Sequence, residues 1–155
     1  MKEKFKRAYM QTAQIFAELS HARRLKVGAI VVKDDRIISI GYNGTPAGWN
    51  NNCEDEIIET TTEETGKATV VTTRKVLKTK PEVLHAESNA IAKLARSIES
   101  GLGAAIFITH SPCLECAKLI FQSGIQQVYY QEKYRDDLGL EFLQASGVDV
   151  EQLPA

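Results

Sequence analysis

The strongest constraint on the fold is a set of metal-binding side chains carried by two short segments. His85-Ala86-Glu87 is followed about 25 residues later by Pro112-Cys113-Leu114-Glu115-Cys116. These segments supply one imidazole, two thiols and one carboxylate that is not needed to bind metal. A catalytic zinc ion takes three protein ligands and keeps its fourth position open for water. The fold is therefore expected to bring His85, Cys113 and Cys116 together around zinc, with Glu87 beside them.

The spacing within each segment favours a position at the start of a helix. Cys113 and Cys116 are three residues apart, so their sulfurs share one face of a helical turn. The positive end of the helix dipole lowers a thiol pKa and favours the thiolate that binds metal. Side chains two apart on a regular helix point in nearly opposite directions. His85 and Glu87 can flank one pocket only if His85 stands at the helix entrance, which we expect.

A purely structural metal site is the alternative reading of these residues. Such a site normally has four protein ligands, and the remaining candidates are Cys53, His21 and His110. Cys53 lies in a polar segment. A structural zinc ion has no use for the carboxylate of Glu87, so the pattern favours a catalytic ion that activates water.

The alternation of apolar runs and helical patterns predicts an α/β fold. We expect a three-layer α/β/α architecture with a central mixed sheet of about five strands. The 155 residues fit a single domain, residues 1–155, large enough to bury a core without disulfides. The expected helices cover residues 3–20, 86–100, 113–123 and 136–146, and the expected strands cover residues 27–33, 36–42, 104–109, 126–131 and 148–151.

Two segments do not follow this alternation. Residues 43–52 are rich in Gly, Asn and Pro and are predicted to form a loop. Residues 55–79 are polar and contain a threonine-rich tract. We expect this second segment to be a variable insertion over the core that is partly ordered at most.

Charge and composition limit the partners and the compartment. A net charge of −1 provides no basic face for a nucleic acid, so no nucleic-acid partner is expected. The apolar runs are too short to cross a bilayer, and the first residues lead into no apolar signal core. No membrane association is expected. Three cysteines, two of them assigned to zinc, leave no disulfide framework, which favours a cytoplasmic protein.

The pattern H-x-E…P-C-x-x-C is the signature of zinc nucleobase deaminases, and this sequence resembles the cytidine deaminase superfamily. It is most similar to the deoxycytidylate (dCMP) deaminases. The resemblance runs from about residue 20 to 150, with a poor match at residues 55–79. Besides the metal segments, it rests on Val27-Gly28-Ala29, Gly41-Tyr42-Asn43-Gly44-Thr45-Pro46, Asn52-Cys53-Glu54 and Lys80-Pro81-Glu82-Val83-Leu84.

The resemblance implies that His85, Cys113 and Cys116 bind zinc and that Glu87 shuttles the proton. It also implies that Asn43 holds the nucleotide sugar, although a turn residue would look the same. A basic cluster, Arg23, Arg24 and Lys26, either meets the 5′-phosphate or is a solvated surface. Tyr130 and Tyr134 either close over the base or fill space. The candidate substrate-binding residues are Lys26, Ala29, Asn43, Tyr130 and Tyr134.

Regulation is also implied by the resemblance. Many members are homohexamers that dCTP activates and that dTTP inhibits together with magnesium. Their effector site uses the loop that corresponds to residues 41–54. The candidate effector residues here are Arg23, Arg24, Tyr42, Asn43, Gly44, Asn52 and Glu54.

The function expected from the sequence is zinc-dependent hydrolytic deamination of dCMP to dUMP and ammonia, feeding thymidylate synthesis. Three alternatives stay open. A nucleoside deaminase acting on cytidine or deoxycytidine would use the same chemistry without a phosphate site. A tRNA or free-base deaminase would share the zinc motif. A non-catalytic, zinc-stabilised nucleotide-binding module would bind without turnover.

Overall fold

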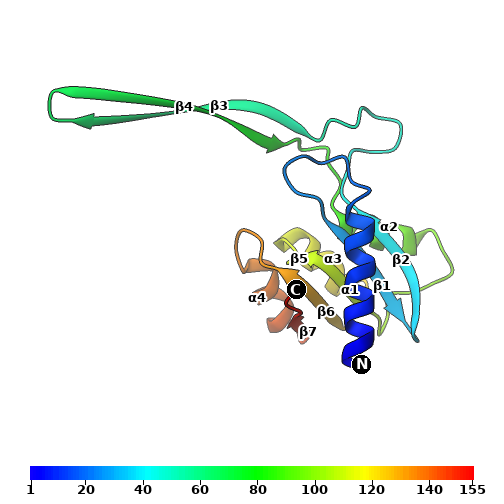
Figure 1. The fold of residues 1–155 in the computed structure, drawn as a ribbon. Helices are drawn as coiled ribbons and strands as arrows, with labels where there is room; N and C mark the ends of the chain where they lie inside the picture. The colour runs from blue at the N-terminus through cyan, green and yellow to red at the C-terminus, as the bar shows by residue number, and fades with distance from the viewer.

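A mixed five-stranded sheet forms the centre of the molecule in the computed structural model, which describes residues 1–155 (Figure 1). Its strand order is β2-β1-β5-β6-β7. β1 pairs antiparallel with β2 and β5, whereas β5, β6 and β7 run parallel. This confirms the predicted mixed sheet. The strands are β1 Gly28–Lys33, β2 Arg36–Tyr42, β5 Ala105–His110, β6 Gln127–Glu132 and β7 Asp149–Gln152.

Helices cover both faces of the sheet, which confirms the three-layer architecture. The long helix α1 lies alone on one face (Figure 1), where Met10 and Ala13 pack against Ile30 and Phe107. The other three helices share the opposite face and its larger core. Adjacent strand residues serve opposite cores because successive side chains alternate across a sheet. The helices are α1 Glu3–Ala17, α2 Ala86–Ala95, α3 Leu114–Gln122 and α4 Leu138–Ala145.

A long β-hairpin projects away from this body (Figure 1). It consists of β3 Glu54–Thr65 and β4 Ala68–Thr79, which pair antiparallel along their full length. The prediction that residues 55–79 form a partly ordered insertion over the core was wrong. Gly66 (φ 59°) opens a two-residue loop that suits a hairpin. Cross-strand pairs such as Glu59 with Arg74 (2.8 Å) add to its stability. We call β3 and β4 together the arm.

None of the helices combines the length and the apolar character needed to cross a membrane. The expected helix over residues 86–100 ends early, at Ala95, and the other predicted helices and strands agree with the structure to within a few residues.

Candidate metal centre and active site

The two predicted metal-binding segments meet where α2 and α3 begin. His85 is the N-cap residue of α2, with extended backbone angles (φ −79°, ψ 154°). Cys113 is the N-cap residue of α3, also extended, and its sulfur accepts a hydrogen bond from the backbone N–H of Cys116. The expectation that both segments stand at helix entrances is confirmed. His85 and Cys113 therefore lie just before their helices, and Cys116 lies in the first turn of α3.

The nitrogen and the two sulfurs of this cluster converge on one point. The Nδ1 atom of His85 lies 3.4 Å from the Sγ atom of Cys116 and 3.6 Å from that of Cys113. All three donor atoms lie within 4.8 Å of one another. One imidazole and two thiolates form a donor set that zinc favours, and three ligands leave a fourth position open. The residues present therefore fit a catalytic zinc ion.

Hydrogen bonds within the cluster shift the pKa values of its three side chains. Hydrogen bonds from Cys116 and His85 lower the pKa of the Cys113 thiol. The same hydrogen bond, with burial, raises the pKa of the Cys116 thiol, and the bond to Cys113 raises the pKa of His85. Metal ligands must be deprotonated, so zinc would displace the remaining protons.

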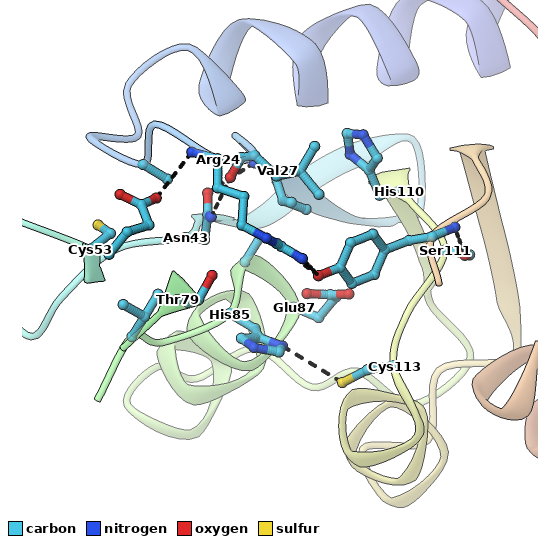
Figure 2. A pocket seen from close by; sticks show the side chains of 16 residues that line it. Arg24, Val27, Asn43, Cys53, Thr79, His85, Glu87, His110, Ser111 and Cys113 are labelled. Carbon is cyan, nitrogen blue, oxygen red and sulfur yellow. Dashed lines mark hydrogen bonds between the residues drawn. The ribbon is translucent and has the colours of Figure 1, made fainter. Parts of the chain in front are cut away.

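Glu87 lies in the first turn of α2, facing the same cavity as His85 (Figure 2). Its side chain is only 4% exposed, and burial raises its pKa to about 7. A carboxyl group with such a pKa can both accept and donate a proton near neutral pH. The helix-entrance position of His85 allows the two side chains to flank one cavity, as expected from their spacing.

Two glycines allow the neighbouring elements to approach the ligands. A Cβ atom on Gly41 would lie 2.1 Å from the carbonyl oxygen of Ala86, at the start of α2. A Cβ atom on Gly139 would lie 2.1 Å from the carbonyl oxygen of Pro112, beside Cys113. Both distances are far below van der Waals contact. β2 can therefore pack against the start of α2, and α4 against the segment just before α3, only because Gly41 and Gly139 have no side chain.

A cavity of about 570 Å³, including its open mouth, extends from the cluster. In Figure 2, Cys113 and Cys53 lie at opposite ends of the cavity, and Asn43 and Glu87 lie between them. Ligand pockets of this kind combine an apolar lining with a few polar groups. The lining residues are Ala22, Arg24, Leu25, Val27, Asn43, Cys53, Glu54, Thr79, Val83, His85, Ala86, Glu87, His110, Ser111, Cys113 and Tyr134.

Arg24 and Tyr134 both line the cavity and bind each other. Both terminal nitrogens of Arg24 donate to the hydroxyl oxygen of Tyr134, at 2.9 and 2.7 Å. The backbone N–H of Tyr134 in turn donates to Ser111. The Arg135 guanidinium lies over the Tyr134 ring, 5.2 Å from its centroid. Neither arginine has a carboxylate within ion-pair distance, so two uncompensated cations stand beside the cavity. Arg24 and Tyr134 are 110 positions apart in the sequence, so no local sequence pattern predicts their contact.

Glu54 anchors the loop that carries Arg23 and Arg24. It is 1% exposed, and one carboxylate oxygen accepts the backbone N–H groups of Arg23 and Arg24. The other oxygen makes no hydrogen bond, although the Arg23 Nε atom lies 3.5 Å away. The Arg23 guanidinium also donates to Glu56 and Asn52. Arg23 is therefore committed to carboxylate and amide partners, unlike Arg24.

Asn43 lines the cavity, but its amide group already has partners. Its Oδ1 atom accepts the backbone N–H of Val27, and its Nδ2 atom donates to the carbonyl of Leu25, both at 2.8 Å. The side chain therefore fixes the segment before β1. The role of Asn43 in binding the nucleotide sugar, which the resemblance implies, stays a prediction.

Only some of the predicted substrate-binding residues lie at the cavity. Of the predicted substrate-binding residues, Asn43 and Tyr134 line the cavity, whereas Lys26, Ala29 and Tyr130 do not. Lys26 pairs with Glu18 at 3.7 Å, and Ala29 and Tyr130 are buried within β1 and β6.

The effector candidates divide as well. Tyr42, Asn43 and Gly44 line a second depression, which also contains His21, Lys93 and Arg96. Arg24 and Glu54 line the first cavity together with Asn43. Arg23 and Asn52 line neither of these hollows and bind each other. The seven predicted effector residues therefore do not all line one hollow of this structure.

Comparisons with known proteins agree with this geometry. Residues 3–132 match the family model of the cytidine and deoxycytidylate deaminase zinc-binding region. The deoxycytidylate deaminase of Enterobacteria phage T4 is 35% identical over 170 residues, covering 94% of this chain and 88% of the relative. ComE operon protein 2 of Bacillus subtilis is 35% identical over 146 residues, covering 94% and 69%.

A crystal structure provides a more similar relative. The dCMP deaminase from the cyanophage S-TIM5, solved in complex with dCMP and dUMP, is 44% identical to this chain. The two structures superpose with a TM-score of 0.82, and the match covers 99% of each chain.

Proposed function

Because the chain belongs to the cytidine and deoxycytidylate deaminase family, we propose that it hydrolyses dCMP to dUMP and ammonia. The observation that carries this proposal is the convergence of three zinc-type donors on one point of a cavity that also contains the buried carboxylate of Glu87. The substrate assignment is supported by the cyanophage relative, which was solved with dCMP and dUMP. The product dUMP would feed thymidylate synthesis.

The chain supplies both the metal ligands and the proton carrier for this reaction. His85, Cys113 and Cys116 would hold the zinc ion, which would supply a Lewis acid that makes water a nucleophile at neutral pH. Glu87 accepts a proton from the attacking water and delivers it to ring nitrogen N3 as the oxygen bonds to C4. Glu87 then passes a second proton from that oxygen to the departing amine. The bond between C4 and the exocyclic amine breaks, ammonia leaves, and Glu87 returns to its ionised state.

Burial gives Glu87 a role that a surface carboxylate could not fill. Its raised pKa of about 7 means that accepting and releasing a proton cost similar free energies at neutral pH. The dry surroundings also strengthen its interaction with a developing positive charge on the base.

We infer that Arg24, rather than Arg23 or Lys26, binds the 5′-phosphate. Arg23 and Lys26 are engaged by carboxylates, whereas the guanidinium of Arg24 is held only by the neutral phenol of Tyr134. A guanidinium binds a phosphate through two parallel hydrogen bonds. The phosphate would replace the Tyr134 hydroxyl as the acceptor, and Arg135 would add a second cation.

The substrate assignment is tested by comparing ammonia release from dCMP, deoxycytidine and cytosine by the zinc-loaded protein. We expect turnover of dCMP with a much higher kcat/KM than that of deoxycytidine. Equal rates on dCMP and deoxycytidine would indicate a nucleoside deaminase. Zinc binding without release from any substrate would indicate a non-catalytic module.

We propose that regulation uses the second depression, next to Tyr42, Asn43 and Gly44. Its cations Lys93 and Arg96 suit a triphosphate. We propose dCTP as the activator and dTTP as the inhibitor, with magnesium bound to the triphosphate, in a cytoplasmic homohexamer. Measuring dCMP turnover with each triphosphate, with and without magnesium, tests this regulation. Rates that neither triphosphate changes would contradict it.

A further inference from the structure

The arm exposes almost all of its residues to solvent. Every residue of β3 after Glu54 is exposed, and so are the first eight residues of β4. Each strand contains twelve residues, about twice the usual length of a strand. An isolated two-stranded hairpin is at best marginally stable in water. An arm of this length therefore calls for further contacts.

The two free edges of the arm differ in charge. β3 carries six acidic side chains and no basic one: Glu54, Asp55, Glu56, Glu59, Glu63 and Glu64. The outer half of β4 is Ala68-Thr69-Val70-Val71-Thr72-Thr73, which has no charge at all. Val70 and Val71 are 49% and 60% exposed.

Charge and bulges are the devices that keep a free strand edge from pairing with another chain. β3 has the charge. The outer half of β4 has neither charge nor proline, and the β3–β4 ladder continues through it without a register shift. A neutral, β-branched six-residue segment of this kind pairs readily with a further strand. The β4 edge is therefore the open edge of the arm.

We propose that this edge pairs with the same edge of a second copy of the chain. The segment is its own complement, because antiparallel pairing about a two-fold axis that sets Val71 opposite Val71 of the copy brings together residues 69–73, none of which is charged. The result is a four-stranded sheet in which both outer edges are the acidic β3 strands. Because both copies use the same surface, this contact joins two copies and leaves no free β4 edge for a third. Pairing through β3 would instead bring acidic strands together.

The alternation of hydrogen bonds along the arm shows which residues face the free edges. In a hairpin with a two-residue loop, the residues flanking the loop, Thr65 and Ala68, form a hydrogen-bonded pair, and the pairs then alternate. Thr62 and Val71 oppose each other in this ladder. Both point their backbone N–H groups outward, Thr62 from the β3 edge and Val71 from the β4 edge.

This pair provides matched variants at the same height of the arm. Proline at an outward-facing position removes one N–H without breaking the ladder of the hairpin. We expect Val71→Pro to raise the dissociation constant of the paired copies about tenfold or more. Each copy loses one N–H donor, so two hydrogen bonds between the copies are lost. We expect Thr62→Pro to leave that dissociation constant unchanged. Sedimentation velocity over a dilution series measures both effects.

A variant with a shortened arm tests the same pairing without relying on a proline, which could disturb the hairpin. Replacing residues 60–73 with Gly-Lys joins Glu59 to Arg74, which already pair, and removes the open edge. This variant should lose the same association as Val71→Pro. The proposal is overturned by a wild-type protein that sediments as a 17.2 kDa monomer, by a shortened arm that keeps the wild-type assembly, or by equal effects of the two prolines.

Discussion

At the scale of single residues, the site combines side chains that local patterns reveal with others that they do not. His85, Glu87, Cys113 and Cys116 are visible in the sequence because metal coordination requires fixed residue types at short spacings. Arg24 is different. Its sequence neighbours Arg23 and Lys26 carry the same charge, and only their partners in the fold separate the three.

The assignment of Arg24 to the phosphate predicts a selective loss. Arg24→Ala should raise KM for dCMP about tenfold to a hundredfold, because a charge-assisted pair is lost. Deoxycytidine, which has no phosphate, should react at an unchanged kcat/KM. Steady-state kinetics on the two substrates measures the difference. Lys26→Ala is the matched control and should behave as the wild type does, whereas a larger effect at Lys26 would contradict the assignment.

His110 gives a prediction about pH and stability. Burial lowers the pKa of this cavity-lining histidine below its usual 6.5. The unfolded chain therefore binds more protons below pH 6.5, so the free energy of unfolding should fall as the pH drops through this range. His110→Gln should flatten that dependence by up to about 1.4 kcal/mol per pH unit. Denaturant unfolding of the zinc-loaded protein between pH 5 and 7 measures it; identical slopes would contradict the prediction.

At the scale of elements, predictability follows the local signals. The helices and the buried strands have apolar patterns of the right period, so their positions follow from the sequence. The arm has no such pattern, because residues exposed on both faces of a hairpin need no alternation. Its stability depends on pairing across strands, as between Glu59 and Arg74. The signal that was available is the short turn at Gly66 between two threonine-rich, β-branched runs.

The close approach of β2 to α2 can be tested at Gly41. An alanine there would drive its Cβ atom into the carbonyl of Ala86 and the backbone nitrogen of Ala90. We expect Gly41→Ala to lower the free energy of unfolding by about 1–3 kcal/mol and to weaken zinc binding, because α2 must shift. Gly44→Ala is the control, since nothing lies within 4 Å of its Cβ position. Chemical denaturation should separate the two variants; equal stabilities would show that α2 does not depend on this contact.

At the scale of the whole molecule, the metal site joins elements that are distant in the sequence. The ligands come from the starts of α2 and α3, and both helices pack on one face of the sheet with α4. The three-layer architecture was predictable from the order of strands and helices. The course of the cavity was not, because its walls come from residues 22 to 134. Sequence reasoning therefore identified the chemistry more completely than the substrate contacts.

Zinc bound at such a junction should stabilise the entire fold. A ligand that binds the native state raises the free energy of unfolding in proportion to the logarithm of its concentration over Kd. Removing zinc with a chelator should lower the melting temperature, and adding zinc back should restore it. Cys116→Ser should remove most of this response. A melting temperature that chelation leaves unchanged in the wild type would contradict a metal site at these residues.

The central claim is that Glu87 moves protons without binding the metal. Its most direct test is the Glu87→Gln variant, which keeps the shape and removes the ionisable group. Zinc content and ammonia release from dCMP are measured on the same preparation. The expected result is one zinc ion per chain, as in the wild type, with turnover reduced by at least about a hundredfold. Near-normal turnover, or loss of zinc from the variant, would contradict the assigned role.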